Sequence, residues 1–173
     1  MANWSVNNDL INGNDMFLYL VDISAEGAEM NGTSAISASQ VVAYATSCSL
    51  EVNADTLDTT SKFSCRWNAV RPGNASYTVS ADALYCKKAN AAANSAYTID
   101  DLFDLMIEGK NIGWVIAQDK KDPEECEPEG PDGSKPYYWG EGAITSLSIN
   151  AGNNEIVSSS ISITGSGPVN YEG

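Results

Sequence analysis

Side chains that could carry out catalysis are scarce in this sequence. The 173 residues include no histidine, which excludes a histidine base and any Ser-His-Asp or Cys-His arrangement. Gly165-Ser166-Gly167 is too short for the nucleophile elbow of hydrolases, and neither a phosphate-binding loop nor a GxGxxG motif occurs. Carboxylate pairs suited to glycoside hydrolysis are unavoidable among 23 acids, so they indicate nothing. We therefore expect a protein that is not an enzyme, with no catalytic residues and no cofactor.

Metal sites and disulfides receive little support either. The four cysteines form no CxxC pair, and no histidine is present to complete a zinc site. Free thiols in a reducing cytoplasm are the favoured interpretation, and a Cys48–Cys86 bridge across paired strands stays open. Residues 119–136 carry seven acids and four prolines but no EF-hand pattern, so a solvent-exposed acidic loop is expected rather than a Ca²⁺ site.

The net charge of the chain argues against a nucleic-acid-binding protein. Nine Lys and Arg residues stand against 23 Asp and Glu, a net charge of −14. Such a chain repels phosphates over roughly 8 Å at physiological salt, whereas DNA binding needs basic side chains. The first ten residues lack the features of a signal peptide, and no stretch approaches the roughly 18 apolar residues of a membrane span. We expect no membrane partner.

Two groups of aromatic residues could contact a partner. Trp114 and Tyr137–Trp139 could stack on sugars, although aromatic residues on strands more often belong to a core or an interface. The second group lies in the segment Asp55–Ala75, which also holds three of the nine cations. Trp and Arg are frequent anchors of protein interfaces, so this segment is predicted to be a projecting loop that binds another subunit. An ordinary hairpin tip is the alternative, and the predicted contact residues are Lys62, Phe63, Arg66, Trp67 and Arg71.

Alternation of polar and apolar residues predicts the strands that hold these groups. The pattern runs for about a dozen residues from Val42 and returns in Ser76–Tyr85, which favours a long β-hairpin arm over about residues 40–86. Met16–Val21 and Asn111–Gln118 are predicted to be shorter strands.

One helix is predicted over about residues 98–109. Thr98 is a suitable N-cap, two acids follow in the first turn, and Gly109 can end the helix. Its apolar stripe is expected to pack on a sheet and consists of Ile99, Leu102, Phe103, Leu105 and Met106.

A second hairpin is predicted near the C-terminus, with its turn at Asn150–Asn154. Apolar residues occupy odd positions, and hydroxyl residues occupy even positions, among them Ser146, Ser148, Ser158, Ser160 and Ser162. Ile144 and Ile156 break this phase, which indicates a bulge or a strand end. Together these elements predict a single domain over residues 1–173 that is mainly β, an antiparallel β-sandwich or half-barrel with one flanking helix.

Three segments carry a family resemblance. AYATSCSLEVNADTLDTTSK (43–62), YTVSADALY (77–85) and GEGAITSLSINAGNNEIVSSSISITGSGPV (140–169) resemble the tail tube, or major tail, proteins of tailed phages. The likeness is strongest to those in prophages of Bacteroidetes-type bacteria. These segments cover about half of the chain and lie in the expected order; the N-terminal 1–38 and the insertion 119–136 do not contribute.

The resemblance implies a structural role in a virion tail that is assembled in the host cytoplasm. Tail tube subunits form six-membered rings that stack into a hollow tube, with inner strands joined into a continuous barrel and a long hairpin loop reaching the neighbouring ring. That loop maps to Asp55–Ala75 here. The resemblance further implies tape-measure and tail-terminator or baseplate proteins as partners, with DNA passing through without specific binding. Inner tubes of contractile injection systems share the fold, so such a subunit is an alternative.

A conduit for DNA must not hold its cargo, and this requirement suggests a role for the hydroxyl residues. Lysines on the wall would bind phosphates and slow passage, whereas hydroxyls and negative charges would not. We therefore expect the polar sides of 144–164 and 41–53 to face the lumen, with Glu51 and Asp55 as acidic wall residues, although either side could instead pack outward. A β-sandwich that binds glycans and a fimbrial or surface-layer subunit are the other candidates.

Overall fold

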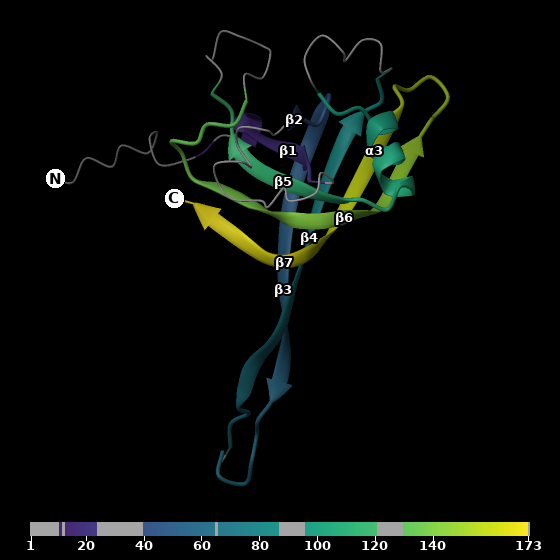
Figure 1. Cartoon of the computed structure of the whole chain (residues 1–173). Helices are drawn as coiled ribbons and strands as arrows, with labels where there is room; N and C mark the ends of the chain where they lie inside the picture. Colours follow the sequence, from purple (N-terminus) through teal and green to yellow (C-terminus); the bar gives the residue numbers. More distant parts are fainter. Residues whose placement is uncertain are drawn as a thin grey trace, which may run out of the picture.

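The protein folds into a single antiparallel sheet with one covering α-helix, as the sequence predicted (Figure 1). The structure is a computed structural model that describes residues 11, 13–23, 40–64, 66–86, 96–120 and 130–172. The seven strands lie in the order β2-β1-β5-β6-β7-β4-β3. The elements are η1 (Gly13–Asp15), β1 (Met16–Asp22), β2 (Gln40–Val41), β3 (Ala45–Asp58), β4 (Val70–Leu84), α3 (Ile99–Ile107), β5 (Asn111–Gln118), β6 (Tyr137–Asn150) and β7 (Ser158–Glu172).

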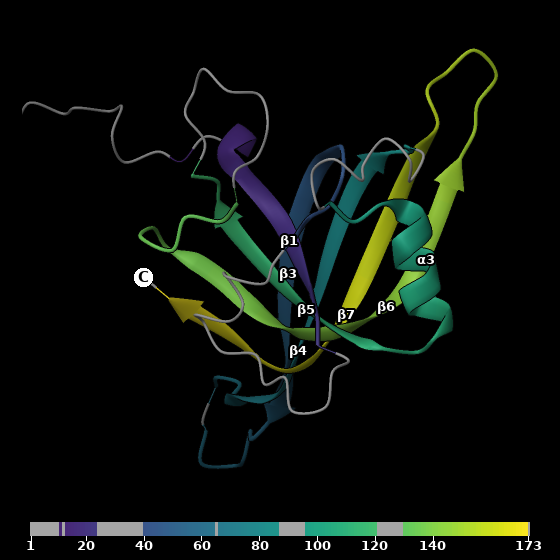
Figure 2. The same ribbon diagram turned by 45° about the horizontal axis from the view of Figure 1, so that its top comes forward.

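The sheet folds over on itself into two layers because β6 belongs to both of them (Figure 2). The first half of β6 pairs with β5 as far as Ala143, and its second half pairs only with β7. Register shifts at 139/141 and 144/146 mark the bend, as expected of bulges. One layer therefore contains β2, β1 and β5, and the other contains β3, β4, β7 and the second half of β6.

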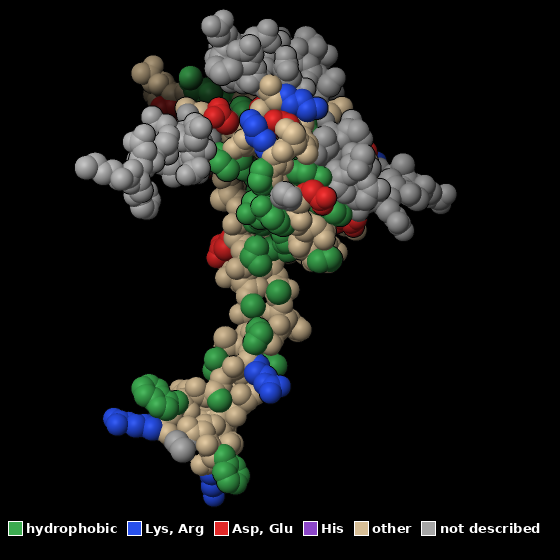
Figure 3. Space-filling view, turned by 90° about the vertical axis from the view of Figure 1, so that its left-hand side faces the viewer, with side chains coloured by type: hydrophobic (Ala, Val, Ile, Leu, Met, Phe, Trp, Pro, Cys, Tyr) green, Lys and Arg blue, Asp and Glu red, His purple; other side chains and the backbone are tan. Residues whose placement is uncertain are grey.

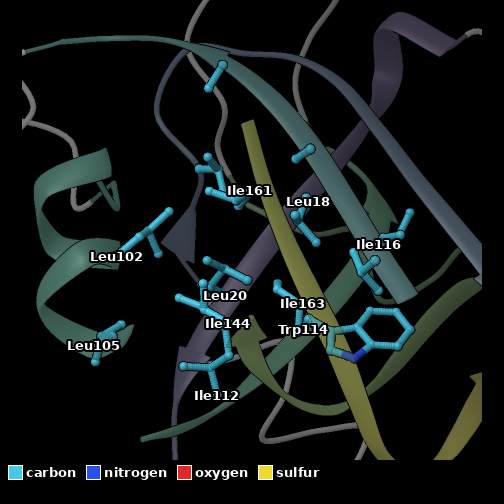
Figure 4. Packing of buried hydrophobic residues seen from close by; sticks show 14 of the residues in the cluster. Leu18, Leu20, Leu102, Leu105, Ile112, Trp114, Ile116, Ile144, Ile161 and Ile163 are labelled. Carbon is cyan, nitrogen blue, oxygen red and sulfur yellow. The ribbon is translucent and has the colours of Figure 1, made fainter. Parts of the chain in front are cut away.

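The core fills the space between the two layers (Figure 4). Leu18, Leu20 and Trp114 from the first layer face Val79 and Ile163 from the second, and all five are fully buried. Strand β4 keeps the predicted alternation, with its odd positions from 77 to 83 buried and its even positions partly or fully exposed. In β5, by contrast, residues 112–117 are all buried, because its second face packs in a smaller cluster with Tyr19, Val21 and Tyr137.

Helix α3 closes the side of the sandwich next to β6. The Thr98 hydroxyl accepts a hydrogen bond from the Asp101 amide, and the Asp101 carboxylate accepts one from the Thr98 amide, which forms a capping box. Gly109 follows the helix with φ +66°, a conformation that suits glycine. The predicted apolar stripe is narrower than expected. Ile99, Leu102 and Leu105 are buried, whereas Phe103 and Met106 remain 49% and 37% exposed.

Strands β3 and β4 continue beyond the rest of the sheet as a two-stranded arm (Figure 1). β4 pairs with β7 only over 78–84, so 53–58 and 70–76 pair with each other alone. The arm has a register shift between Ala54 and Thr56. The hairpin spans 45–84 rather than 40–86, because Gln40–Val41 pairs with β1 instead. Its connecting loop spans 59–69. Residues 55–58 and 70–75, which were expected to belong to the loop, are parts of β3 and β4.

The C-terminal hairpin follows its predicted pattern closely. The register shift at Ile144 is the expected bulge, and Ile156 lies before β7 begins. Asn154 in the turn has φ +66°, a conformation that asparagine tolerates. The two positions at which the alternation of polar and apolar residues is interrupted therefore mark a bulge in β6 and the residues before β7.

Candidate functional site

A continuous polar surface crosses the second layer on the side away from the core. The strand register places Ser148, Ser160, Asp82 and Ser47 in one row, and Ser146, Ser162, Ser80 and Ser49 in the next. A third row contains Thr164, Thr78 and Glu51. We call this surface, with Ser158 at its end, the hydroxyl face. It brings together Glu51 and the five serines predicted from the sequence.

Hydrogen bonds link side chains of neighbouring strands on the hydroxyl face. Ser47 Oγ donates to Asp82 Oδ2 at 2.8 Å, and the Thr145 and Thr164 hydroxyls lie 2.9 Å apart. Ser148 and Ser160 form a longer contact of 3.4 Å. The face is therefore polar yet internally bonded, and it presents hydroxyl groups rather than long flexible side chains.

The hydroxyl face is free of positive charge. Strands β3, β6 and β7 contain no Lys or Arg, and the single cation of β4 is Arg71, which lies in the arm. Asp82 and Glu51 are its charged members. Asp55 does not join them, because it lies in the arm beyond the last pair between β4 and β7.

The arm tip gathers aromatic and cationic side chains (Figure 3). Phe63 is 95% exposed and Trp67 is 80% exposed, and Lys62 and Arg66 are exposed beside them. Arg71 lies a short distance up the arm, where it pairs with Leu57. No acid occurs between Thr59 and Arg71, although the chain has 23. The tip is thus a basic, aromatic end on an otherwise acidic molecule.

Local hydrogen bonds shape the tip loop. The Thr59 amide donates to the Ala69 carbonyl at 2.8 Å and closes the hairpin, and the Ser64 amide donates to the Ser61 carbonyl at 2.9 Å. Hydrogen bonds from the Thr60 hydroxyl and amide hold the pKa of Asp58 below its usual value. These contacts give the loop a defined shape and leave its aromatic rings exposed.

A groove along the seam between β1 and β3 is a feature that the sequence patterns did not reveal. It has a volume of about 1200 Å³, and none of the described residues that line it is charged. β3 and β1 approach each other there at Cys48, whose thiol donates to the Met16 carbonyl oxygen at 3.9 Å. We call it the seam groove. The alternation in the sequence indicated that Leu50 and Val52 share one side of their strand. It did not indicate that this side lies opposite β1, because that depends on how the sheet folds.

The aromatic residues considered for sugar stacking do not form a platform. Trp114 is completely buried and contacts Tyr77 edge to face, with ring centroids 5.5 Å apart. Tyr137 is buried in the smaller cluster, and Tyr138 packs on Tyr171. The stacking role predicted as an alternative for Trp114 and Tyr137 is therefore wrong.

Reactive groups in the described part of the chain are isolated from one another. Cys48 and Cys86 are free thiols, which excludes the bridge between them, and burial raises the pKa of both. Cys65 and Cys126 lie outside the described residues. Within the described ranges, no three potential metal ligands lie together, and no helix has the length and apolarity that a bilayer crossing requires.

The acidic loop at 119–136 is described only at its two ends. Asp119 is buried beside Tyr19, and burial, aided by the Asp119 charge, holds the pKa of Tyr19 well above its usual value. Asp132 accepts hydrogen bonds from the Ser134 hydroxyl and amide, which lower the pKa of Asp132. The remaining acids of the predicted loop, at 121–129, lie outside the described residues.

Comparison with known proteins assigns the chain to a family. A family model described as "Phage tail tube protein" matches residues 10–171, so the chain belongs to the phage tail tube protein family. It is accordingly a structural subunit of a virion tail and not an enzyme. This confirms the family that the three sequence segments indicated. No curated protein sequence matches the chain significantly.

Solved tail tubes share the fold at low sequence identity. The tail of an empty gene transfer agent particle, refined with C6 symmetry, matches with a TM-score of 0.64 and 17% identity over 95% of this chain and 100% of the other. The SPP1 tail tube matches with a TM-score of 0.63 and 15% identity over 95% and 80%. The sheath–tube complex of an extracellular contractile injection system, PVC, matches with a TM-score of 0.56 and 13% identity over 99% of each chain.

Proposed function

We propose that six copies of this protein form a ring, and that such rings stack into a hollow tube through which the phage genome passes. The observation that carries the proposal is the hydroxyl face, a wide polar surface without cations. The layer that bears it has, among the described residues, a strand edge without a partner at each side. The C6 symmetry of the similar gene transfer agent tail supports six as the number of copies.

Strand directions explain how such a ring can close. Within the second layer, β3, β4, β7 and β6 alternate in direction, so its two outer strands run opposite ways. The outer edge of β3 has no strand partner among the described residues, and neither has β6 beyond Ile144. A second copy in the same orientation can therefore pair its β6 with this β3 and continue the antiparallel pattern. Free edges of this kind are rare in monomers.

In this ring the hydroxyl face lines the bore. Phosphates passing along it would meet hydroxyls, Asp82 and Glu51, and no lysine or arginine. Lysine and arginine side chains bind DNA by displacing the counterions of its phosphates. A wall without these side chains therefore binds DNA weakly, as passage of the genome requires. Ser146, Ser148, Ser158, Ser160 and Ser162 are the proposed wall residues, with Asp55 placed at the junction between rings.

The arm joins each ring to the next one. Its tip carries the exposed aromatic and basic residues Lys62, Phe63, Arg66 and Trp67, with Arg71 behind them, and the rest of the chain supplies an acidic surface to receive it. Tape-measure and tail-terminator or baseplate proteins are the further partners of such a tube. A Bacteroidetes-type host is also proposed, and it rests on the sequence resemblance alone.

An inner tube of a contractile injection system is the second candidate, supported by the likeness to the PVC sheath–tube complex. The two candidates differ in whether a sheath surrounds the tube. Isolating intact particles and identifying the proteins that copurify with the tube separates them, because a contractile system supplies a sheath protein in numbers similar to those of the tube subunit.

Negative-stain microscopy of the purified protein tests the proposal directly. Rings, or tubes of uniform bore, are expected on concentration, and class averages of the rings should show six-fold symmetry. A single compact particle at every concentration would contradict self-assembly. Rings of another symmetry would contradict the number of copies alone.

A further inference from the structure

We infer that the exposed face of helix α3 is a lateral docking surface that occupies the seam groove of the next copy in the ring. This inference rests on the proposed ring and adds the partner surface to it. It identifies which apolar residues are covered by assembly, and it gives α3 a role beyond closing its own core.

The two sides of the sandwich differ in how they are closed. On the side next to β6, α3 covers the gap between the layers with Ile99, Leu102 and Leu105 (Figures 2 and 4). On the other side, next to β3, the described residues leave the seam groove open. The molecule therefore presents a helix at one side and an uncharged hollow at the other.

The outer face of α3 carries exposed apolar side chains between its acidic residues. Phe103 and Ile107 lie four residues apart on the same face and are 49% and 68% exposed, with Met106 beside them. Asp104 is exposed on the same part of the helix, whereas Asp100 is half-buried and accepts a hydrogen bond from the Tyr85 hydroxyl at 3.2 Å.

The seam groove is suited to receive apolar side chains. Leu50 and Val52 from β3, Phe17 and Met16 from β1, and Tyr138 from β6 line it, and Val52 is 56% exposed. Because none of the described residues that line the groove is charged, apolar side chains of a helix can enter it without burying an unpaired charge of the groove. Aromatic and apolar side chains that meet in a desolvated pocket are typical of interface centres.

The free strand edges bring these two surfaces together. α3 packs on β6, beside the free edge of that strand, and the seam groove lies beside the free edge of β3. Both lie on the core side of the second layer, opposite the hydroxyl face. Antiparallel pairing of β6 from one copy with β3 of the next thus moves α3 toward the groove of that next copy. The contact is head to tail, as a closed ring requires.

Site-directed cross-linking tests the inference. In a background whose four native cysteines are replaced by serine, Val52→Cys and Ile107→Cys are combined, rings are assembled, and a short bis-maleimide is added. A ladder of covalent oligomers up to six copies is expected on denaturing gels. The matched control combines Val52→Cys with Ser134→Cys, which places the second thiol on an exposed loop away from α3, and it should give no ladder.

The outcomes separate this inference from the proposed ring. Rings that are visible by microscopy but give no ladder with Ile107→Cys overturn the inference and leave the ring standing. A groove filled instead by residues 1–10 of the same chain would give that result, together with a cross-link from Val52→Cys to a cysteine placed in 1–10. Wild-type protein that forms no rings overturns the proposed function itself.

A second variant guards against loss of folding. Ile107→Ser, at an exposed helix position, should leave the thermal melting temperature nearly unchanged and raise the concentration needed for ring formation at least tenfold. Leu57→Ser removes an apolar side chain of comparable exposure, 58% against 68% for Ile107, from the arm and should leave that concentration unchanged. Equal behaviour of the two variants would overturn the inference.

Discussion

The ring of Tyr77 lies against the backbone of Gly165, in the space that a Cβ atom at position 165 would occupy. Tyr77 is the first buried residue of β4, at the point where this strand enters the sheet from the arm. Its hydroxyl donates a hydrogen bond to the Glu141 carbonyl, and its ring contacts Trp114. Through these contacts the base of the arm is fixed to β6, β7 and the core.

This packing predicts that Gly165→Ala destabilises the protein by about 1–3 kcal/mol, because the added methyl group must displace the Tyr77 ring. The free energy of unfolding in urea measures the effect. Gly13→Ala is the matched control, since nothing lies within 4 Å of a Cβ at that position. If both variants unfold at the same urea concentration as wild type, the Tyr77–Gly165 packing does not constrain the arm.

Positive charge on the hydroxyl face should hinder DNA passage. We expect Ser158→Lys together with Ser160→Lys to leave tube assembly intact and to slow genome ejection, because each lysine adds a phosphate-binding site to the bore. Phage carrying the change would be assayed for DNA release in vitro. Ser134→Lys adds a lysine on an exposed loop and should release DNA at the wild-type rate. Unchanged ejection by the double variant would contradict the lumen assignment.

The arm tip should control stacking without controlling ring closure. Replacing Arg66 by Glu and Trp67 by Ala removes an aromatic anchor and reverses a charge, so rings are expected with few or no tubes. High salt should weaken stacking of the wild-type rings in the same direction. Tube length distributions by electron microscopy measure both effects. Asn68→Ala, at an exposed tip position, should stack normally, and long tubes from the double variant would exclude the tip as a connector.

The capping box of α3 predicts that Thr98→Ala lowers the stability of the folded protein. Loss of the hydroxyl leaves the Asp101 amide without its acceptor, and a decrease in stability of about 1 kcal/mol is expected. Thr98→Ser keeps the hydroxyl and should recover most of the stability. Differential scanning calorimetry compares the three proteins, and a Thr98→Ala protein that melts with wild type would show that packing alone holds the helix.

The turn at Asp58 predicts a specific pH dependence. Hydrogen bonds from Thr60 lower the pKa of Asp58 in the folded arm relative to its unfolded value of about 3.9. Their stabilisation is therefore present above that unfolded value and is lost as the pH falls through the folded pKa. An NMR titration should show the Asp58 pKa rising in Thr60→Ala. Thr59→Ala, whose hydroxyl donates to Ala69 instead, should leave it unchanged.

Local patterns in the sequence were sufficient to predict the longer strands and the helix, but not the short strand β2. The alternation at Tyr77–Ala83 and the Thr98 cap depend on near neighbours, and both appear in the structure as expected. The hydroxyl residues of β6 and β7 could be assigned to one face for the same reason, because a period of two fixes the side of the strand.

Features that depend on pairing across the whole sheet could not be predicted in this way. The second face of β5 is buried in a cluster with residues of β1 and β6, so Val115 and Ala117 are core residues although no alternation distinguishes them. The seam groove arises only when β1 and β3, far apart in sequence, come together. The exposure of Phe103 and Met106 could not be predicted either. Their helical spacing is the same whether they pack on the sheet of their own chain or on a neighbouring copy.

The register shift in the arm has a consequence for the mechanics of a tail. If the arms connect the rings, a tail that curves must lengthen on one side and shorten on the other. No other described strand flanks the two-stranded ribbon around Ala54 and Thr56, and bulges bend and twist a strand locally. Curvature would therefore be taken up by these slender joints, and the walls of successive rings would keep their shape while the tail flexes.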